Sequence, residues 1–371
     1  MSGKTASHAK SPITPPSDAN HPNLKPEDYD MVDSEKDLAH FQPLSGILAS
    51  CHTILFPRYQ ESDKAAIRHQ KHHKRLTIIA AVCGAIAVLF AIVQLSWFFL
   101  FPWPMWVEVL AALTTFVAVI LGLEQARHPR WILERHKAER CRFLKFRAFI
   151  DPALWTEGAG VNADWEQQLR DEVHEIKKLT RKSLHESLER HEVSDIPHGL
   201  SQCVVTEEKL KALVNYFQEK RIHCQMTYFD NRAKSSKKIN KYTQNLPPLL
   251  FFFSILAVFS HFVIDIFFKS VHKMHTIGII LIALAASFPV IGAGIRTLRS
   301  AHEFARLASL FRAKHNALKR IRDALDELMN EKIAVKNKTE QVLHTLWQCE
   351  QFLEDEHYEW LRLMLEAEWY G

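Results

Sequence analysis

The stretch LTIIAAVCGAIAVLFAIVQLSWFFLF, residues 76–101, decides the fold because it holds no Asp, Glu, Lys or Arg. A helix needs about 20 apolar residues to cross the hydrocarbon core of a bilayer. Residues 106–123 form a second, shorter apolar run after a proline-containing interruption, and Glu124 ends it. These two runs predict a helical hairpin in a membrane.

The same arrangement recurs later in the chain. Residues 246–268 form a third apolar run, residues 269–275 a short loop, and residues 276–295 a fourth run. The alternative is that the runs form two buried hairpins of a soluble protein. Because charged residues bracket each run, the pattern favours an all-α membrane protein with four transmembrane helices in two hairpins.

The distribution of Lys and Arg predicts the orientation. Positions 124–147 hold eight of these residues, and others lie at 64–75, 234–241 and 296–299. The first hairpin turn has none, and the second has only Lys269 and Lys273. Cytoplasmic ends of membrane spans are enriched in Lys and Arg. We therefore expect a multi-pass protein of the inner (plasma) membrane, with both termini in the cytoplasm.

The composition argues against several classes of protein. The 371 residues include only 11 glycines, whereas usage of about 7% is ordinary, so a sandwich, barrel or Rossmann fold with many tight turns is disfavoured. The six cysteines form no C-x-x-C pair, which argues against a zinc site. No nucleophile–base pattern, catalytic carboxylate pair or phosphate-cradling glycine loop stands out. We expect no enzymatic activity, no cofactor and no bound metal.

The apolar runs and the composition of the segments between them predict the domain organisation. Residues 1–42 contain five prolines and few large apolar groups, a composition typical of disorder. Apolar stripes at helical spacing continue beyond the spans and predict a cytoplasmic helical stalk or coiled-coil bundle. We expect a disordered cytoplasmic tail over 1–42, a first hairpin unit over 43–155, a charged helical linker over 156–204, a second hairpin unit over 205–336 and a C-terminal cytoplasmic helix over 337–371.

The two units share a charged pattern after their second spans. It is Arg135-x3-Glu139-x2-Arg142 in the first unit and Arg299-x3-Glu303-x2-Arg306 in the second. Residues three and four apart share one helix face, so each set predicts an inter-helix ion-pair ladder. Such a ladder is either a solvated helix face or a bridge between neighbouring copies of the hairpin.

The residues after the first hairpin resemble those of a known family, the SLATT group (SMODS and SLOG-associating two-transmembrane effector domain). The resemblance covers about residues 58–370, as two units in tandem. The motifs that carry it are Trp131-x3-Arg135-x3-Glu139-Arg140-x-Arg142-Phe143-x2-Phe146-Arg147, Tyr216-x4-Arg221-x3-Gln225-x2-Tyr228-x3-Arg232-Ala233 and Glu356-x2-Glu359-Trp360-Leu361.

The resemblance implies a membrane effector of bacterial conflict systems. In that family a nucleotide second messenger or another sensor triggers the two-span domain, which then oligomerises and opens a pore or disrupts the membrane. No sensor domain is evident in this sequence, so a separate sensor protein or nucleotide signal is expected to be its trigger. The lipid bilayer and further copies of the chain are its expected partners.

Ionisable groups inside a span are the first candidates for function. His261 and Asp265 lie four apart on one face of the third span and are a candidate pore or ion path. In the simpler interpretation, Asp265 reaches the outer interface and His261 bonds a neighbouring helix. Pro289, Gly292 and Gly294 form a candidate hinge in the fourth span.

Three functions remain open from the residues. The first is an oligomeric pore or membrane-perturbing effector, supported by close-packing pairs such as Ala80-x3-Gly84. The second is a non-conducting scaffold or signalling adaptor, and the third is a small ion transporter that uses His261 and Asp265. The basic run at 69–75 meets the positive-inside requirement without any ligand, so no nucleic acid is expected as a partner.

Overall fold

A computed structural model of the protein describes residues 29–97, 103–124, 127–156, 160–189, 196–267, 272–302 and 304–369. The structure is about 90% helical, and no strand occurs among the described residues. Residues 1–28, most of the predicted tail, lie outside the described part, as does Glu303. The helical class predicted from the scarcity of glycine and from the apolar runs is confirmed.

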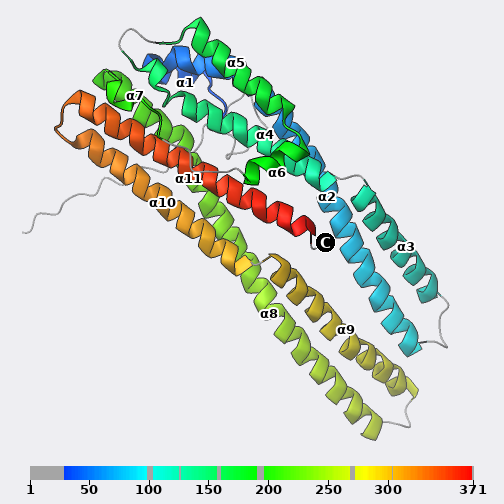
Figure 1. The fold of residues 1–371 in the computed structure, drawn as a ribbon. Helices are drawn as coiled ribbons and strands as arrows, with labels where there is room; N and C mark the ends of the chain where they lie inside the picture. The colour runs from blue at the N-terminus through cyan, green and yellow to red at the C-terminus, as the bar shows by residue number, and fades with distance from the viewer. Residues whose placement is uncertain are drawn as a thin grey trace, which may run out of the picture.

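Two long helices connect the two ends of the molecule. Helix α2 (Ser45–Trp97) has 53 residues and α8 (Cys224–Phe267) has 44, so at about 1.5 Å per residue α2 is roughly 80 Å long. The apolar half of α2 pairs with α3 (Trp103–Glu124), and that of α8 pairs with α9 (His272–His302). The two hairpins project from the same end of the molecule, where α9 also contacts α2 (Figure 1).

The other end is a bundle of amphipathic helices around one large apolar core (Figure 1). The first halves of α2 and α8 pack there with α1, α4, α5, α6, α7, α10 and α11. Their bounds are α1 Glu35–His40, α4 Arg127–Ala148, α5 Ala163–Lys178, α6 Arg181–Glu189, α7 Glu207–Tyr216, α10 Phe304–Asn330 and α11 Val335–Trp369. Short 3-10 segments η2 (Gln42–Leu44), η3 (Pro152–Leu154) and η4 (Leu200–Gln202) and a π-helical segment η5 (Phe217–His223) complete it.

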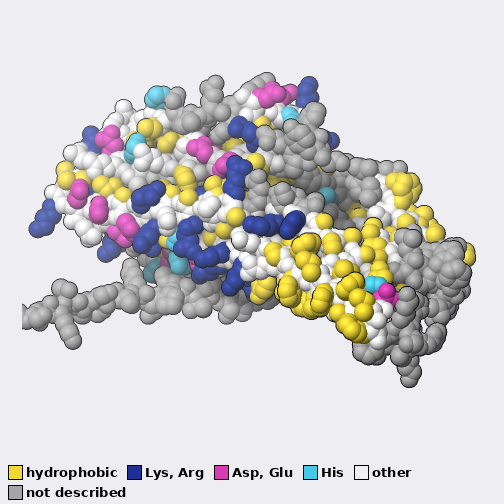
Figure 2. Space-filling view, turned by 90° about the horizontal axis from the view of Figure 1, so that it is seen from below, with side chains coloured by type: hydrophobic (Ala, Val, Ile, Leu, Met, Phe, Trp, Pro, Cys, Tyr) yellow, Lys and Arg dark blue, Asp and Glu magenta, His cyan; other side chains and the backbone are white. Residues whose placement is uncertain are grey.

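Three helices are long and apolar enough to cross a membrane. They lie within Gln42–Ile92, Glu207–Phe267 and Thr276–Arg296, whereas α3 contributes only a shorter apolar segment, Val109–Ala118, among the described residues. Phe252 is 60% exposed on α8 and Phe116 is 62% exposed on α3. Apolar side chains gather at one end of the face that Figure 2 shows. Because monomeric soluble proteins rarely expose such large apolar patches, the structure indicates membrane association.

The predicted tail needs one correction. Its composition predicts disorder up to residue 42, but Asp30, Met31, Asp33 and Phe41 are buried in the bundle, and α1 begins with Ser34 as its N-cap. Composition fails here because the partners that hold the segment, which are buried positive charges and apolar side chains, lie on distant helices.

Candidate functional site

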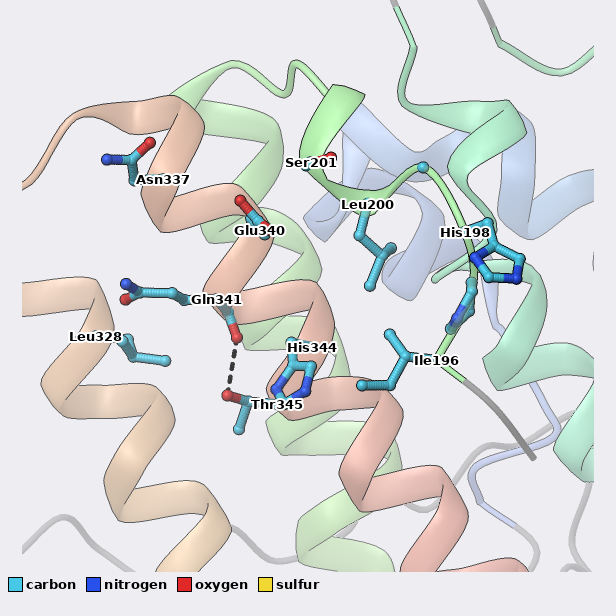
Figure 3. A pocket seen from close by; sticks show the side chains of 12 residues that line it. Ile196, His198, Leu200, Ser201, Leu328, Asn337, Glu340, Gln341, His344 and Thr345 are labelled. Atoms are coloured by element: carbon cyan, nitrogen blue, oxygen red, sulfur yellow. Dashed lines mark hydrogen bonds between the residues drawn. The ribbon is translucent and has the colours of Figure 1, made fainter. Parts of the chain in front are cut away.

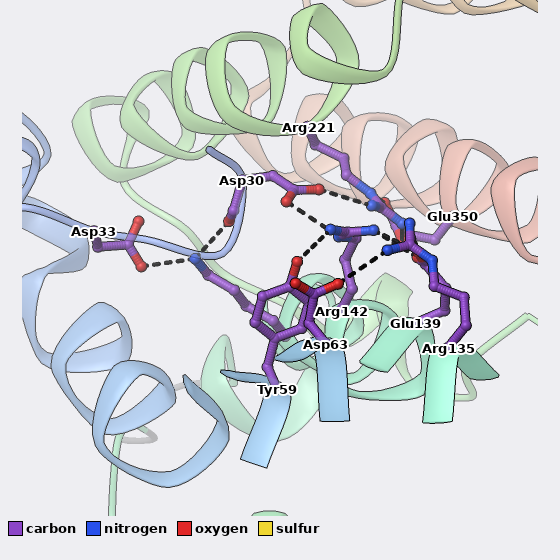
Figure 4. Close-up of polar contacts among 10 residues, drawn as sticks. Asp30, Asp33, Tyr59, Asp63, Arg135, Glu139, Arg142, Arg221 and Glu350 are labelled. Carbon is purple, nitrogen blue, oxygen red and sulfur yellow. Dashed lines mark hydrogen bonds and ion pairs between the residues drawn. The ribbon is translucent and has the colours of Figure 1, made fainter. Parts of the chain in front are cut away.

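The bundle holds an acidic N-terminal segment, residues 29–37, which we call the acidic strap. Each of its aspartates accepts hydrogen bonds from buried cations. Asp30 accepts from Arg142 Nε at 3.1 Å and from Arg221 Nη1 at 3.2 Å. Asp33 accepts from Lys145 Nζ at 2.7 Å, and Asp37 accepts from Lys220 Nζ at 2.7 Å. The strap thus contacts four buried positive charges. Figure 4 shows its Asp30 beside Arg142 and Arg221.

These four cations come from both units of the chain. Arg142 and Lys145 lie on α4, after the first hairpin, whereas Lys220 and Arg221 lie on η5, before the second hairpin. A π-helical turn contains an extra residue, and η5 directs the consecutive Lys220 and Arg221 both into the interior. The acidic strap therefore links the two units; we call the strap and its four cations the clamp.

The clamp extends to the C-terminal helix. Arg221 donates from Nε and Nη2 to the two carboxylate oxygens of Glu350 on α11, each at 2.8 Å. Both side chains are buried, at 1% and 0% exposure. A buried charge is tolerated only when it is paired and hydrogen-bonded, and this bidentate geometry is the strongest form of pairing for arginine.

The predicted ladder of the first unit adjoins the clamp and shares Arg142 with it. Glu139 is 2.6 Å from Arg135 and 2.6 Å from Arg142. Arg135 also reaches Asp63 on α2 at 3.2 Å, and Arg142 donates to the hydroxyl of Tyr59 at 2.8 Å. Burial alone would raise the pKa of Glu139, but Arg135 and Arg142 outweigh it and hold the pKa well below its usual range. The ladder is thus an internal connection between α2 and α4, not a solvated face.

The corresponding residues of the second unit are arranged differently. Arg299 donates from Nε to the side-chain oxygen of Asn240 on α8 at 3.2 Å. Arg306 lies on the exposed surface of α10, and Glu303 lies outside the described residues. The two units therefore use related sequences in different surroundings.

A pair of histidines joins α4 to α11 beside the clamp. His136 Nδ1 lies 3.0 Å from His357 Nε2, and the two rings are stacked at 5.3 Å between centroids. Burial, the neighbouring His357 and Arg140 lower the pKa of His136 well below its usual range. Burial lowers the pKa of His357 to about 4, although Glu139 opposes the shift. Both rings are therefore neutral at pH 7.

The candidate ion path lies in the second hairpin. The ring of His261 packs on α9, so that a Cβ added at Gly278 would lie 3.0 Å from its Nδ1. This nitrogen is buried and has no hydrogen-bond partner among the described residues. Asp265, one turn further along α8, is exposed on the apolar surface. Within one chain, His261 therefore contacts the partner helix while Asp265 faces outward.

The candidate hinge residues differ in their surroundings. Helix α9 continues through Pro289. A Cβ on Gly292 would lie 3.7 Å from the Cα and carbonyl oxygen of Pro247, which marks a close approach of α9 to α8, whereas one on Gly294 would have no neighbour within 4 Å. In the first hairpin, a Cβ on Gly84 would lie 3.7 Å from the side chain of Thr115 on α3. Gly84 and Gly292 thus allow the two helices of each hairpin to approach closely within one chain.

A shallow groove lies at the far end of the bundle (Figure 3). It has a volume of about 1230 Å³ and lies between residues 196–201 and the start of α11. His198, Glu340 and His344 are its titratable residues. No group of three or more His, Cys, Asp or Glu side chains arranged to hold a metal occurs in the described part of the chain.

The clamp is the feature that the sequence did not reveal. The ladder was visible from its spacing, but Asp30, Asp33, Lys145, Lys220 and Glu350 carried no recognisable motif. Arg142 and Arg221 belong to the motifs of the resemblance, and the consecutive cations Lys220 and Arg221 follow apolar residues, but neither feature indicates an acidic partner near residue 30. No protein-family model, curated protein or solved structure matches the chain.

Proposed function

We propose that the protein is an integral membrane effector of the SLATT type, with two units in tandem, that assembles into oligomers and opens a pore or disrupts the membrane. Its trigger is a separate sensor protein or a nucleotide signal in a bacterial conflict or defence pathway. The observation that carries the proposal is the exposure of two apolar hairpins on one end of a bundle that is otherwise charged on its surface (Figure 2).

In this proposal four helices cross the inner membrane. Helix α3 is the fourth crossing: its 22 residues amount to about 33 Å at 1.5 Å per residue, enough for a bilayer core of about 30 Å. The bundle lies in the cytoplasm as a helical stalk, since the Lys and Arg residues gather on its side of the spans. Both termini are then cytoplasmic.

Asp265 supports a pore over a non-conducting scaffold. Its side chain is exposed between the apolar Phe262 and Ile266, which are 58% and 54% exposed. A carboxylate that faces lipid is costly, so intramembrane charges usually face other protein or a water-filled path. Contact of α8 with a neighbouring copy would give Asp265 such surroundings. A position at the outer interface is the alternative, which would leave a scaffold or adaptor.

The clamp supports a silent resting state. It fixes α4 of the first unit against η5 of the second. Helix α4 packs along α2, and η5 leads into α8, so each segment is coupled to the first helix of one hairpin. The relative position of the hairpins therefore depends on buried ion pairs in the cytoplasmic bundle. A signal that acts on the bundle has a direct mechanical route to the membrane.

Controlled expression in bacterial cells tests the proposal. We expect strong induction of the full chain, which drives assembly by mass action without the trigger, to depolarise the inner membrane, as read by a potential-sensitive dye, and to stop growth. A His261→Ala, Asp265→Ala variant, present in the membrane at the same level, should depolarise less. Full polarisation at high membrane levels of the wild-type chain would favour the scaffold instead.

A further inference from the structure

A second pocket lies where the second hairpin leaves the bundle. It has a volume of about 700 Å³ and is formed by α8, the end of α9 and the start of α10. Pro247 and Pro248 line it on the membrane side, next to Leu246 and Leu249, which are 41% and 49% exposed. The pocket therefore opens at the level where apolar surface gives way to charged surface.

The lining of this pocket is basic and polar. Arg296, Arg299 and Arg306 contribute guanidinium groups from α9 and α10, and Asn240 and Thr243 contribute polar side chains from α8. None of the described lining residues is acidic. Arg299 is oriented by the bond from its Nε to Asn240, which uses only one of the five N–H donors of a guanidinium group.

A pocket whose described lining holds three arginines and no carboxylate matches one ligand chemistry. A guanidinium binds a phosphate oxygen pair through two parallel N–H donors, and it is only weakly hydrated, which suits a site at a membrane surface. A phosphate at this position would come either from a lipid headgroup or from solution. The exposed leucines beside the pocket favour the lipid, because its acyl chains can lie along α8 while the headgroup occupies the pocket.

We infer that this pocket binds the phosphate of an anionic phospholipid at the cytoplasmic face of the second hairpin. Basic side chains beside the apolar surface are visible in Figure 2. The bound lipid would link α8 to α9 and α10 at the point where they enter the membrane. The inference requires that α8 and α9 lie in a bilayer, but it does not require that the protein forms a pore.

Lipid retention by the full chain tests this inference. The protein is purified in a neutral detergent, and the binding of phosphatidylglycerol is titrated by native mass spectrometry beside phosphatidylcholine. The test variant is Arg296→Gln, Arg299→Gln, Arg306→Gln. The control, Lys237→Gln, Lys238→Gln, Lys241→Gln, removes the same charge from exposed positions of α8 outside the pocket.

We expect phosphatidylglycerol to bind the wild type and the control with similar affinity, and phosphatidylcholine to bind much more weakly. The test variant should lose about fivefold in affinity per arginine removed. The single Arg296→Gln change, at an exposed position, provides the same comparison if the triple variant misfolds. Equal affinity in the arginine and lysine variants would overturn the inference. Displacement of the lipid by millimolar inorganic phosphate would overturn it as well, in favour of a soluble anion site.

Discussion

The Ser254 hydroxyl on α8 donates a hydrogen bond to the backbone carbonyl of Ala285 on α9, at 2.7 Å. Four residues after Ala285 comes Pro289, which has no N–H to donate to that carbonyl. In the apolar part of a membrane, an unpaired carbonyl costs several kcal/mol. Ser254 therefore supplies from the neighbouring helix the donor that the proline removes.

This relationship predicts that Ser254→Ala weakens the second hairpin. We expect a loss of about 1–2 kcal/mol, the range of an interhelical hydrogen bond in a membrane, seen as a lower melting temperature of the detergent-solubilised protein. Ser287→Ala is the matched control, since that hydroxyl only bonds the carbonyl of Ala283 in its own helix. The Pro289→Ala change restores the missing N–H, so Ser254→Ala should cost less when the two changes are combined. An equal cost with and without Pro289→Ala would contradict the explanation.

The close approach of Gly292 to Pro247 makes a second prediction. A leucine at Gly292 would meet the backbone of Pro247 and push α9 away from α8, because two helix backbones leave no room there for a large side chain. Gly294→Leu serves as the control, because the added Cβ would have no neighbour within 4 Å. Cross-linking of cysteines placed on α8 and α9 should fall in the first variant only. Equal cross-linking in both would show that the hairpin is not held at Gly292.

The clamp makes a third prediction, for stability. Arg221→Met leaves Glu350 as a buried charge without this partner and removes one of the two arginines that bond Asp30. Breaking a buried pair in this way costs about 3–5 kcal/mol. The control is Arg322→Met, whose ion pair with Asp323 is exposed at 36% and 50% and is expected to contribute about 0–1 kcal/mol. Thermal unfolding of the two variants should differ by many degrees. Similar melting temperatures would mean that the clamp does not hold the two units together.

The stacked histidines predict a dependence of stability on pH. His136 and His357 have pKa values below the 6.5 of an unperturbed histidine, and that of His357 is about 4. Between these values the unfolded chain binds protons that the folded chain does not, so stability is complete above pH 6.5 and falls as the pH drops towards 4. The loss approaches about 1.4 kcal/mol per pH unit for each ring.

Melting temperatures at pH 7.5 and 5.5 check this slope. The window avoids Glu139, whose pKa is lowered from 4.5 and whose contribution is therefore lost only at more acidic pH. Burial raises the pKa values of Glu350 and Glu356, so these two carboxyls favour the folded chain as the pH falls and oppose the histidines. A His136→Gln, His357→Gln variant should therefore show a clearly smaller fall in melting temperature at pH 5.5 than the wild type. An equal fall in the two proteins would show that the two rings are not buried in the neutral form.

The sequence reveals the hairpins more completely than the bundle. Residues 76–101, 246–268 and 276–295 are apolar over lengths that only a membrane helix requires, and this local property needs no knowledge of distant contacts. The ladder of Arg135, Glu139 and Arg142 was visible for the same reason, since its members lie within two turns of one helix.

The clamp could not be predicted because it is entirely non-local. Asp30 lies in a segment whose composition is typical of disorder, and its partners are Arg142 and Arg221, far along the chain. Pairing of this kind follows from the packing of the helices, not from spacing in the sequence. The π-helical geometry that directs Lys220 and Arg221 together into the interior also has no sequence signature.

Ion efflux from liposomes tests the central claim most directly. The full chain, with a C-terminal tag that a small molecule multimerises, is reconstituted into vesicles loaded with potassium and a small dye. We predict that forced assembly releases the ions, and that the His261→Ala, Asp265→Ala variant releases them more slowly at equal protein density. Vesicles that stay sealed after assembly has been verified by cross-linking would contradict the proposed effector function.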